Sequence, residues 1–303
     1  MTNILYYKKI TVPLIIFLGA ITSFSLPPYN LFFINFLTLP VLLYILVNYV
    51  DKKTISFFVG WIFGFGYFIS NLYWITNSLT FDVNFKFIIP FALILIPLFL
   101  GIFYGLVTFL CNFFNLKNKI SSILIFSIFF GGIEFLRSFI FGGFPWNLVV
   151  FSLSNNLNSL QILSYIGTYS LNLLSITIFL LPVIFFFKYK SLTKFLIFSL
   201  SLILVVINFL YGNLVIKNFE KKEYDNLSSI IRVVSPNIPI ERFLSNQDTE
   251  KSINELISLS DPHDLKKTIF IYPEGIITSI YLKDLKLFKN IFRENYNVNH
   301  KVI

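Results

Sequence analysis

Long apolar runs separated by short polar connections make up most of the chain. Seven of these runs are long enough to cross a membrane, and they lie at residues 10–26, 31–50, 55–78, 87–114, 120–141, 160–187 and 192–216. Each supplies roughly 20 residues, which matches a hydrocarbon core about 30 Å thick. The pattern therefore predicts a multi-pass α-helical membrane bundle with seven helices, of which the first is the shortest.

The pattern changes near residue 217, where the polar segment NFEKKEYDNLSS follows the last run. Beyond it lie two runs typical of strands, IIRVVSPNI and TIFIYP, each followed by a segment of helical character, near 247–259 and near 281–294. The final NHKVI resembles the start of a third strand. Alternating strands and helices indicate an α/β unit. We therefore expect a transmembrane bundle over 1–216, a linker over 217–228 and the beginning of an α/β domain over 229–303.

Composition and charge support this division. The chain is 56% hydrophobic and 13% charged, with a mean hydropathy of +0.76, whereas about 25% of the residues in a soluble domain are charged. Of the net charge of +9, most lies in residues 1–216, which hold 11 basic and 3 acidic residues. A positive excess within the apolar part is a topology signal, and it does not suggest nucleic-acid binding.

The basic residues also predict an orientation. One side of the predicted bundle carries nine lysines in its connections: Lys8, Lys9, Lys52, Lys53, Lys117, Lys119, Lys188, Lys190 and Lys194. The opposite connections hold Lys86 alone. By the positive-inside rule the N-terminus is cytoplasmic. Seven crossings then place residues 217–303 outside the cell membrane, which in a double-membrane bacterium is the periplasm.

A single carboxylate, Glu274, follows the second predicted strand. The carboxyl ends of strands are where α/β folds collect their active sites. Pro273 stiffens the approach to Glu274, and Gly275 allows the backbone to turn away while the side chain points into a cleft. The alternative is an ordinary exposed loop acid.

Two charged residues, Glu134 and Arg137, lie three positions apart within the fifth apolar run, so they share a helix face. Each costs about 3 kcal/mol to place in lipid, and we expect both to face protein or each other. They form either a structural ion pair or a group that faces the substrate.

The glycine-rich segment after this run, GGFPWN, breaks the helix on the predicted outer side. Pro145 and Trp146 lie in it, and Trp146, like Trp74 toward the outer end of the third run, suits the membrane interface. This segment is either a mobile loop through which a lipid enters or a turn with an aromatic anchor.

The remaining candidates have plainer interpretations. Three glycines of the third run are better explained by close helix packing than by an acyl-chain slot: Gly60, Gly64 and Gly66. Cys111 is expected to be a packed apolar thiol, and a single cysteine excludes a disulfide framework. His263 and His300 lack ligand-like spacing and are expected at the surface. The sequence contains no metal or cofactor signature.

Seven short motifs, taken in order, resemble those of the apolipoprotein N-acyltransferase family. They are GFGYF at 64–68, YW at 73–74, EFLR at 134–137, GFPWN at 143–147, IGTYSL at 166–171, RVVSPNIP at 232–239 and YPE at 272–274. The resemblance spans most of residues 10–280. Their order, more than any one motif, makes the resemblance specific.

This resemblance implies a membrane bundle joined to a nitrilase-like α-β-β-α sandwich, with a Glu-Lys-Cys triad and no cofactor. The cysteine takes an acyl chain from a phospholipid donor, and the amino group of a diacylglyceryl apolipoprotein accepts it. By resemblance Glu274 is the general base and the protein is a monomer. The outer-side residues that face lipid or substrate are Trp74, Glu134, Arg137, Pro145 and Trp146.

The lysine and cysteine of the family match nothing in this chain, since Lys283, Lys286 and Lys289 fall in the predicted helix after Glu274. We therefore expect a sequence truncated at its C-terminus or a decayed gene, and no transferase activity from residues 1–303 alone. Two alternatives stay open. One is a non-catalytic polytopic membrane protein, such as a transporter or scaffold remnant, and the other is a nitrilase-like amidase on a membrane anchor.

Overall fold

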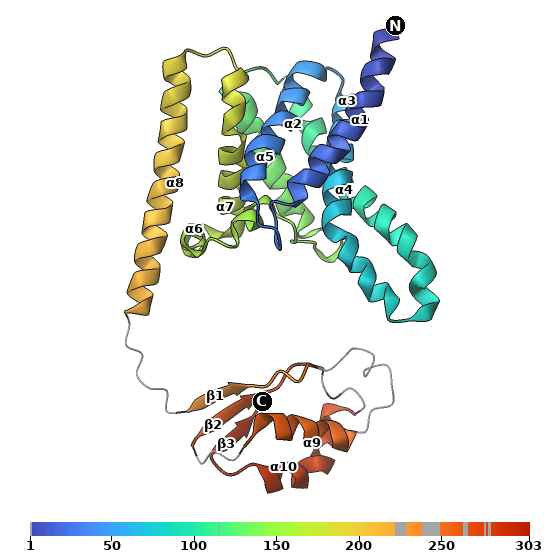
Figure 1. Ribbon diagram of the computed structural model, residues 1–303, viewed down its shortest axis with the longest axis vertical. Coiled ribbons are helices and arrows are strands. Elements are labelled where there is room, and N and C mark those ends of the chain that lie inside the picture. Colours follow the sequence, from blue (N-terminus) through green and yellow to red (C-terminus); the bar gives the residue numbers. More distant parts are fainter. Residues whose placement is uncertain are drawn as a thin grey trace. The chain divides into compact units, whose positions relative to one another are not determined.

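The computed structural model describes residues 2–114, 116–221, 229–237, 249–262, 266–275, 277 and 280–303, with side chains described for all of these except 2–11, 141 and 282. The chain forms two compact units (Figure 1): the bundle unit, Met1–Lys221, and the sheet unit, Lys222–Ile303. Residues 222–228 of the predicted linker lie outside the described residues, and residues 217–220 belong to the last helix of the bundle unit.

The bundle unit consists of α-helices joined and extended by short 3₁₀ segments. The α-helices are α1 (Thr2–Ser23), α2 (Asn35–Tyr49), α3 (Lys53–Leu72), α4 (Ile89–Asn112), α5 (Ile120–Arg137), α6 (Leu157–Leu160), α7 (Leu163–Leu180) and α8 (Ser191–Glu220). The 3₁₀ segments are η1 (Phe32–Ile34), η2 (Tyr73–Thr80), η3 (Val83–Ile88), η4 (Ile140–Gly142), η5 (Val149–Leu153) and η6 (Leu181–Phe186).

Six described segments are long and apolar enough to cross a membrane. They are Phe32–Tyr49, Lys53–Thr80, Val83–Asn112, Ile120–Arg137, Leu163–Phe186 and Ser191–Glu220, and they coincide with the second to seventh runs predicted from the sequence. The first predicted run falls on α1, of which Val12–Ser23 forms a shorter apolar helix. A multi-pass helical bundle is therefore confirmed, while the count of seven crossings stays a prediction.

Glycines let α3 approach its neighbours very closely. A Cβ atom added at Gly66 would lie 2.1 Å from the carbonyl oxygen of Ile16 in α1, and one at Gly60 would lie 2.3 Å from that of Tyr104 in α4. Such spacing brings backbone against backbone, as small residues do between helices in lipid. The interpretation of Gly60, Gly64 and Gly66 as residues of close helix packing is confirmed.

Reciprocal hydrogen bonds join the N-terminal half of α3 to the C-terminal half of α4. The hydroxyl of Ser56 donates to the carbonyl of Thr108 at 2.7 Å, and the hydroxyl of Thr108 donates to the carbonyl of Ser56 at 2.6 Å. One turn further along α4 lies Cys111, whose side chain is completely buried. Its expected role as a packed apolar thiol is confirmed.

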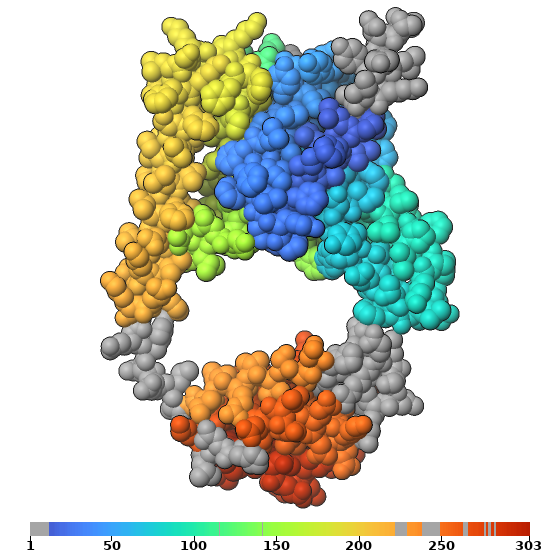
Figure 2. Space-filling model, viewed as in Figure 1, coloured from blue at the N-terminus to red at the C-terminus, as the bar shows by residue number. Residues whose placement is uncertain are grey.

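The helix α8 contacts the rest of the bundle unit over a small part of its surface (Figures 1 and 2). Only 6% of its most apolar stretch is buried within the protein. A Cβ atom at Gly212 would lie 1.8 Å from the carbonyl oxygen of Asn158, and the Asn208 side chain donates to the carbonyl of Ser159 at 3.0 Å. These contacts hold α8 against α6. Lipid is the natural solvent for its other apolar faces.

The described residues of the sheet unit form three parallel strands in the order β1-β2-β3, with α9 and α10 in the connections. The elements are β1 (Ile230–Val233), α9 (Thr249–Ser260), β2 (Thr268–Ile271), η8 (Leu282–Phe288), α10 (Lys289–Asn295) and β3 (His300–Val302). Ile230 pairs with Thr268, which in turn pairs with His300. The predicted third strand is confirmed.

The two faces of this sheet differ. Phe270 is completely buried beside Tyr296 and His300, whose ring centroids lie 5.0 and 5.3 Å from its own. The alternate positions on β1, Ile231 and Val233, are exposed. The helices therefore cover one face, and the described residues leave apolar side chains uncovered on the other.

Two expectations for the sheet unit need correction. His300 is half-buried against Phe270 rather than at the surface, because its side chain points to the helix-covered face of β3. The helix expected near 281–294 begins as the 3₁₀ segment η8 and becomes α-helical only at Lys289. Residues 238 and 239 of the RVVSPNIP motif and His263 lie outside the described residues.

Replacing Gly66 with alanine is expected to destabilise the bundle unit by about 1–3 kcal/mol, the usual cost of overpacking. The new methyl group would meet the backbone of Ile16, which cannot rotate away. The measurement is the denaturant midpoint of the protein in detergent micelles. Gly132→Ala in α5 is the matched control, because nothing lies within 4 Å of its added Cβ. Equal stability of the two variants would contradict the packing argument.

Candidate functional site

A buried carboxylate joins three helices of the bundle unit. Glu134 of α5 is completely buried, and it accepts hydrogen bonds from the Tyr104 hydroxyl of α4 at 3.1 Å and from the Asn172 amide of α7 at 2.5 Å. The Asn172 carbonyl oxygen accepts from the backbone N–H of Val150 at 2.8 Å. A buried charge is tolerated when such donors satisfy it. Glu134 therefore links α4, α5, α7 and η5.

Arg137, one turn further along α5, is 1% exposed and holds the loop that follows. Its Nη2 donates to the carbonyl of Trp146 at 3.0 Å and lies 3.9 Å from Glu134 Oε1. A charge-assisted hydrogen bond measures about 2.7–2.9 Å, so the two charges are close without being directly hydrogen-bonded. The guanidinium carbon lies 5.3 Å from the ring centroid of Phe68 and 5.6 Å from that of Phe144, within cation–π range.

Two glycines form the turn between α5 and this loop. Gly142 and Gly143 have φ angles of +84° and +87°, which residues other than glycine rarely adopt. A Cβ atom at Gly143 would also lie 2.5 Å from the carbonyl oxygen of Ser138. The helix α5 ends at Arg137 rather than at residue 141, and η4 follows. The glycine turn then sends the chain back toward α3.

The far end of the loop is anchored to α3. Tyr67 donates its hydroxyl proton to the carbonyl of Asn147 at 2.9 Å, and the Asn147 amide bonds to the Asn71 side chain. The sequence left a mobile loop and an anchored turn as alternatives. Hydrogen bonds at both Trp146 and Asn147 support the anchored turn.

The loop presents an aromatic pair at the surface of the bundle unit. Trp74, at the start of η2, stacks on Trp146 with ring centroids 5.5 Å apart and an angle of 22° between the planes. The ring centroid of Phe144 lies 5.6 Å from that of Trp146 on the same loop, and Pro145, between the two in sequence, is exposed. Both tryptophans are about half-exposed. Residues 72 positions apart therefore form one aromatic platform with polar ring nitrogens, as expected at a membrane interface.

The structure thus gathers the five outer-side candidates of the bundle unit into one region, with different surroundings for each. Glu134 and Arg137 are buried and bonded to the protein, whereas Trp74, Pro145 and Trp146 are exposed. The first two are placed to position the loop, and the last three are placed to meet a ligand or lipid. Whether they bind substrate stays a prediction.

Glu274 lies in the sheet unit, in a turn directly after β2. It is exposed, and the next residue, Gly275, has a φ of +75°. The predicted strand, the carboxylate at its end and the glycine turn are all present. The conformation of Gly275 is the one that only glycine adopts readily, so the turn direction is built into the sequence.

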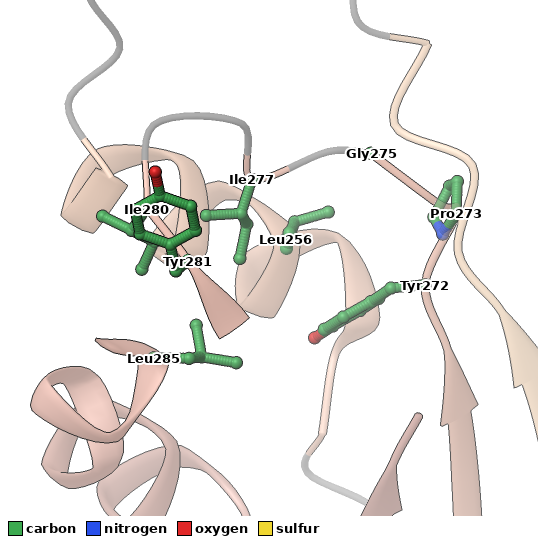
Figure 3. A pocket seen from close by; sticks show the side chains of 8 residues that line it. All are labelled: Leu256, Tyr272, Pro273, Gly275, Ile277, Ile280, Tyr281 and Leu285. Atoms are coloured by element: carbon green, nitrogen blue, oxygen red, sulfur yellow. The ribbon is translucent and has the colours of Figure 1, made fainter. Parts of the chain in front are cut away.

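A cavity of about 210 Å³ is lined by the residues on either side of Glu274 (Figure 3). Its described lining residues include both neighbours of Glu274 but not Glu274 itself: Leu256, Tyr272, Pro273, Gly275, Ile277, Ile280, Tyr281 and Leu285. The residues on either side of Glu274 therefore border a cavity, and a cleft around the Glu274 side chain stays a prediction.

The Tyr272 hydroxyl belongs to a short polar chain at this cavity. It lies 3.0 Å from the Ser260 hydroxyl of α9 and is hydrogen-bonded to the Tyr296 hydroxyl. Burial raises the pKa of Tyr272 above its ordinary value. The phenol is therefore neutral at physiological pH and can donate a hydrogen bond. Within the described part of the chain, His, Cys, Asp and Glu do not gather in groups of three or more that could hold a metal ion.

Sequence reasoning missed the residues that hold this site together. Tyr67, Tyr104 and Asn172 all supply hydrogen bonds within apolar helices. Asn172 carried a usable signal, because a polar residue in a membrane-spanning run usually faces protein. Tyr67 lies in the GFGYF motif at 64–68, but nothing in that motif indicated its hydrogen bond. Tyrosine is common enough in such helices that Tyr104 carried no signal.

Exchanging the two charges, Glu134→Arg with Arg137→Glu, is expected to destabilise the bundle unit by more than 3 kcal/mol, as removal of a buried partner does at about 3–5 kcal/mol. The exchange keeps a pair of opposite charges, but it places guanidinium donors against the donors of Tyr104 and Asn172. The measurement is the unfolding midpoint in micelles.

Glu134→Gln is the matched control. Its amide oxygen can accept from Asn172 and its amide nitrogen can donate to the Tyr104 oxygen, so we expect a loss of about 1–3 kcal/mol. A charge-exchanged protein as stable as the natural one would show that the ion pair, and not the hydrogen-bond network, is what stabilises the bundle.

Comparisons with known proteins agree on one family. Residues 18–181 match the model of the apolipoprotein N-acyltransferase N-terminal domain. The chain is 26% identical over 275 residues to the apolipoprotein N-acyltransferase of Brucella melitensis biotype 1 and 28% identical over 275 residues to that of Agrobacterium fabrum; each match covers 86% of this chain and 51% of the relative. That of Rhizobium rhizogenes is 32% identical over 178 residues, 56% of this chain and 33% of the relative.

The chain spans about half the length of the first two relatives. The family match, in contrast, covers more than half of the 303 residues of this chain and includes most of the bundle unit. The Trp74–Trp146 platform, Glu134 and Arg137 all lie within it. This multi-pass membrane chain belongs to the apolipoprotein N-acyltransferase family.

Proposed function

We propose that the protein N-acylates bacterial lipoproteins. It transfers a fatty acyl chain from a membrane phospholipid to the amino group of a diacylglyceryl-cysteine at the lipoprotein N-terminus. The observation that carries this proposal is the extent of the similarity. A match over 86% of the chain is longer than the 221 residues of the bundle unit, so it continues into the sheet unit that contains Glu274.

The reaction implied by the family proceeds through a thioester. A cysteine sulfur attacks the ester carbonyl of the phospholipid, the carbon–oxygen bond breaks, and the lysophospholipid leaves as an alcohol. The amine of the acceptor then attacks the thioester, forming an amide and regenerating the thiol. A nucleophile that divides one difficult transfer into two easier ones is the logic of covalent catalysis.

In this reaction Glu274 is the general base. It takes the proton of the attacking thiol and returns it to the leaving oxygen, and it repeats this cycle for the amine. Its position at the end of β2 supports the role, because an exposed carboxylate on a glycine turn can reach a reacting group. The lysine and cysteine of the family have no counterpart in residues 1–303, so we expect transfer only from a protein that supplies them.

The bundle unit supports the lipid side of the proposal. The platform of Trp74 and Trp146 is apolar, half-exposed and anchored by Arg137, which suits contact with a lipid at the membrane interface. We propose that the platform, with Pro145, lies at the outer face of the inner membrane. This orientation follows from the nine lysines in the connections of the other side.

The architecture of the sheet unit supports its interpretation as the beginning of a nitrilase-like domain. Its strands are parallel and joined by helices that cover one face. The exposed residues of the other face, Ile231 and Val233, are apolar, as expected where a second sheet packs in an α-β-β-α sandwich. We propose that this unit is periplasmic and that the protein acts as a monomer.

Glu274→Gln is expected to slow N-acylation at least 100-fold, in the range of about 10²–10⁴ attributed to a general base. The intact protein is expressed in bacteria depleted of their own enzyme, and mass spectrometry of the lipoprotein N-terminal peptide reports the added acyl chain.

The matched control is Glu294→Gln in α10, which removes an exposed carboxylate from the same unit. We expect N-acylation at the natural rate from this variant. Natural rates from both variants would remove Glu274 from the mechanism. No acylation from the unmodified intact protein, with the family's lysine and cysteine included, would contradict the proposed function.

A further inference from the structure

A second cavity lies inside the bundle unit, between α4 and the segment around η4. Its volume is about 360 Å³, within the range of about 300–1,000 Å³ typical of small-molecule sites. The lining residues are apolar with one exception, Arg137: Leu95, Ile96, Phe99, Leu100, Phe103, Arg137, Ile140, Gly143 and Phe144. The cavity and the aromatic platform are distinct features that share two residues. Phe144 lines the cavity and lies beside Trp146, and Arg137 lines the cavity and holds the carbonyl of Trp146.

The cavity opens toward the lipid-facing side of α4. Leu95 and Phe99 are 58% and 46% exposed, whereas Leu100, Phe103 and Arg137 are buried. The mouth therefore lies on a helix that is long and apolar enough to span the membrane, and Arg137 lies in the inner wall. Leu95 and Phe103 are about 12 Å apart along the helix, close to the depth of one leaflet, about 15 Å. An occupant reaches such a mouth most directly from the bilayer.

The guanidinium of Arg137 has donors left for that occupant. Its Nη2 is bonded to the loop carbonyl of Trp146, but within the described residues its Nε and Nη1 have no hydrogen-bond partner. Glu134 offers little compensation, because it lies 3.9 Å away and both its oxygens accept from other side chains. Buried arginine donors normally bond to oxygen atoms, most strongly to carboxylate or phosphate oxygens.

We propose that this cavity holds one acyl chain of a glycerophospholipid, with an ester or phosphate oxygen of that lipid bonded to Arg137. The apolar wall accepts the chain, and the two remaining donors of Arg137 recognise the oxygen that ends it. This inference rests on the proposed function, in which such a lipid is the acyl donor. It adds the location of the donor within the bundle and makes Arg137 a residue that contacts it.

The test uses a phosphatidylethanolamine with a diazirine in one acyl chain, incorporated into nanodiscs that contain the full chain. After illumination, mass spectrometry maps the labelled residues. We expect label on the α4 segment from Leu95 to Phe103. Leu95→Trp narrows the mouth and is expected to reduce this label at least threefold.

Ile94→Trp is the matched control, because Ile94 is the adjacent residue, is similarly exposed and does not line the cavity. It should leave the label unchanged. Both substitutions lie on the exposed surface of α4, so neither is expected to prevent folding. Equal labelling of the two variants would show that the probe reports only the lipid around the helix, and it would overturn the proposal.

Two further arms identify the lipid and the role of Arg137. Arg137→Lys keeps the charge but loses the planar fork of donors, and we expect at least a twofold loss of label. Natural labelling by this variant would remove Arg137 from the site. A fatty acid that carries a diazirine should label the cavity weakly, and phosphatidylethanolamine should displace it. Strong labelling by the fatty acid that phosphatidylethanolamine does not displace would assign the cavity to free fatty acids.

Labelling requires no acyl transfer, so the two proposals fail separately. Specific labelling in an intact protein that includes the family's lysine and cysteine and still does not N-acylate lipoproteins would overturn the proposed function and leave the cavity assignment intact. N-acylation without specific labelling would overturn the cavity assignment and leave the proposed function intact.

Discussion

The buried carboxylate of Glu134 is the interaction on which the bundle unit depends. A carboxylate is expensive in an apolar interior, and here donors from two other helices offset that cost. Those donors, Tyr104 and Asn172, belong to α4 and α7, so three helices must be in register before the charge is satisfied. In lipid, where apolar contacts between helices add little over contacts with acyl chains, such a network gives the bundle its specificity.

The position of the loop after α5 follows from this network. Arg137 lies one turn beyond Glu134, so fixing α5 also fixes the guanidinium that holds the carbonyl of Trp146. Tyr67, on the closely packed helix α3, holds the next residue of the loop. The stacking of Trp74 on Trp146 is then the outcome of two anchors on different helices, and a surface feature depends on groups that are themselves buried.

Arg137 has two duties that a single charge pair would not explain. One nitrogen positions the loop, and the residue also lines an apolar cavity beside α4, with its Nε and Nη1 unpartnered within the described residues. A residue that both holds the aromatic platform and binds the acyl donor would couple the presence of lipid to the shape of the surface beside it. The sheet unit contributes a separate feature, the exposed carboxylate of Glu274 in the glycine turn that follows β2.

The sequence by itself determined the apolar spans, the change to an α/β unit near residue 217 and the placement of Glu274 after a strand, because periodicity, length and glycine chemistry are local properties. It also brought Glu134, Arg137 and the loop tryptophan to notice. Only the tertiary structure decided that Glu134 is bonded to Tyr104 and Asn172, that Arg137 holds the loop, and that Trp74 meets Trp146. The contacts of Glu134 and the tryptophan stack join residues 30 to 72 positions apart, and partners at such separations depend on how helices pack, which no local pattern records.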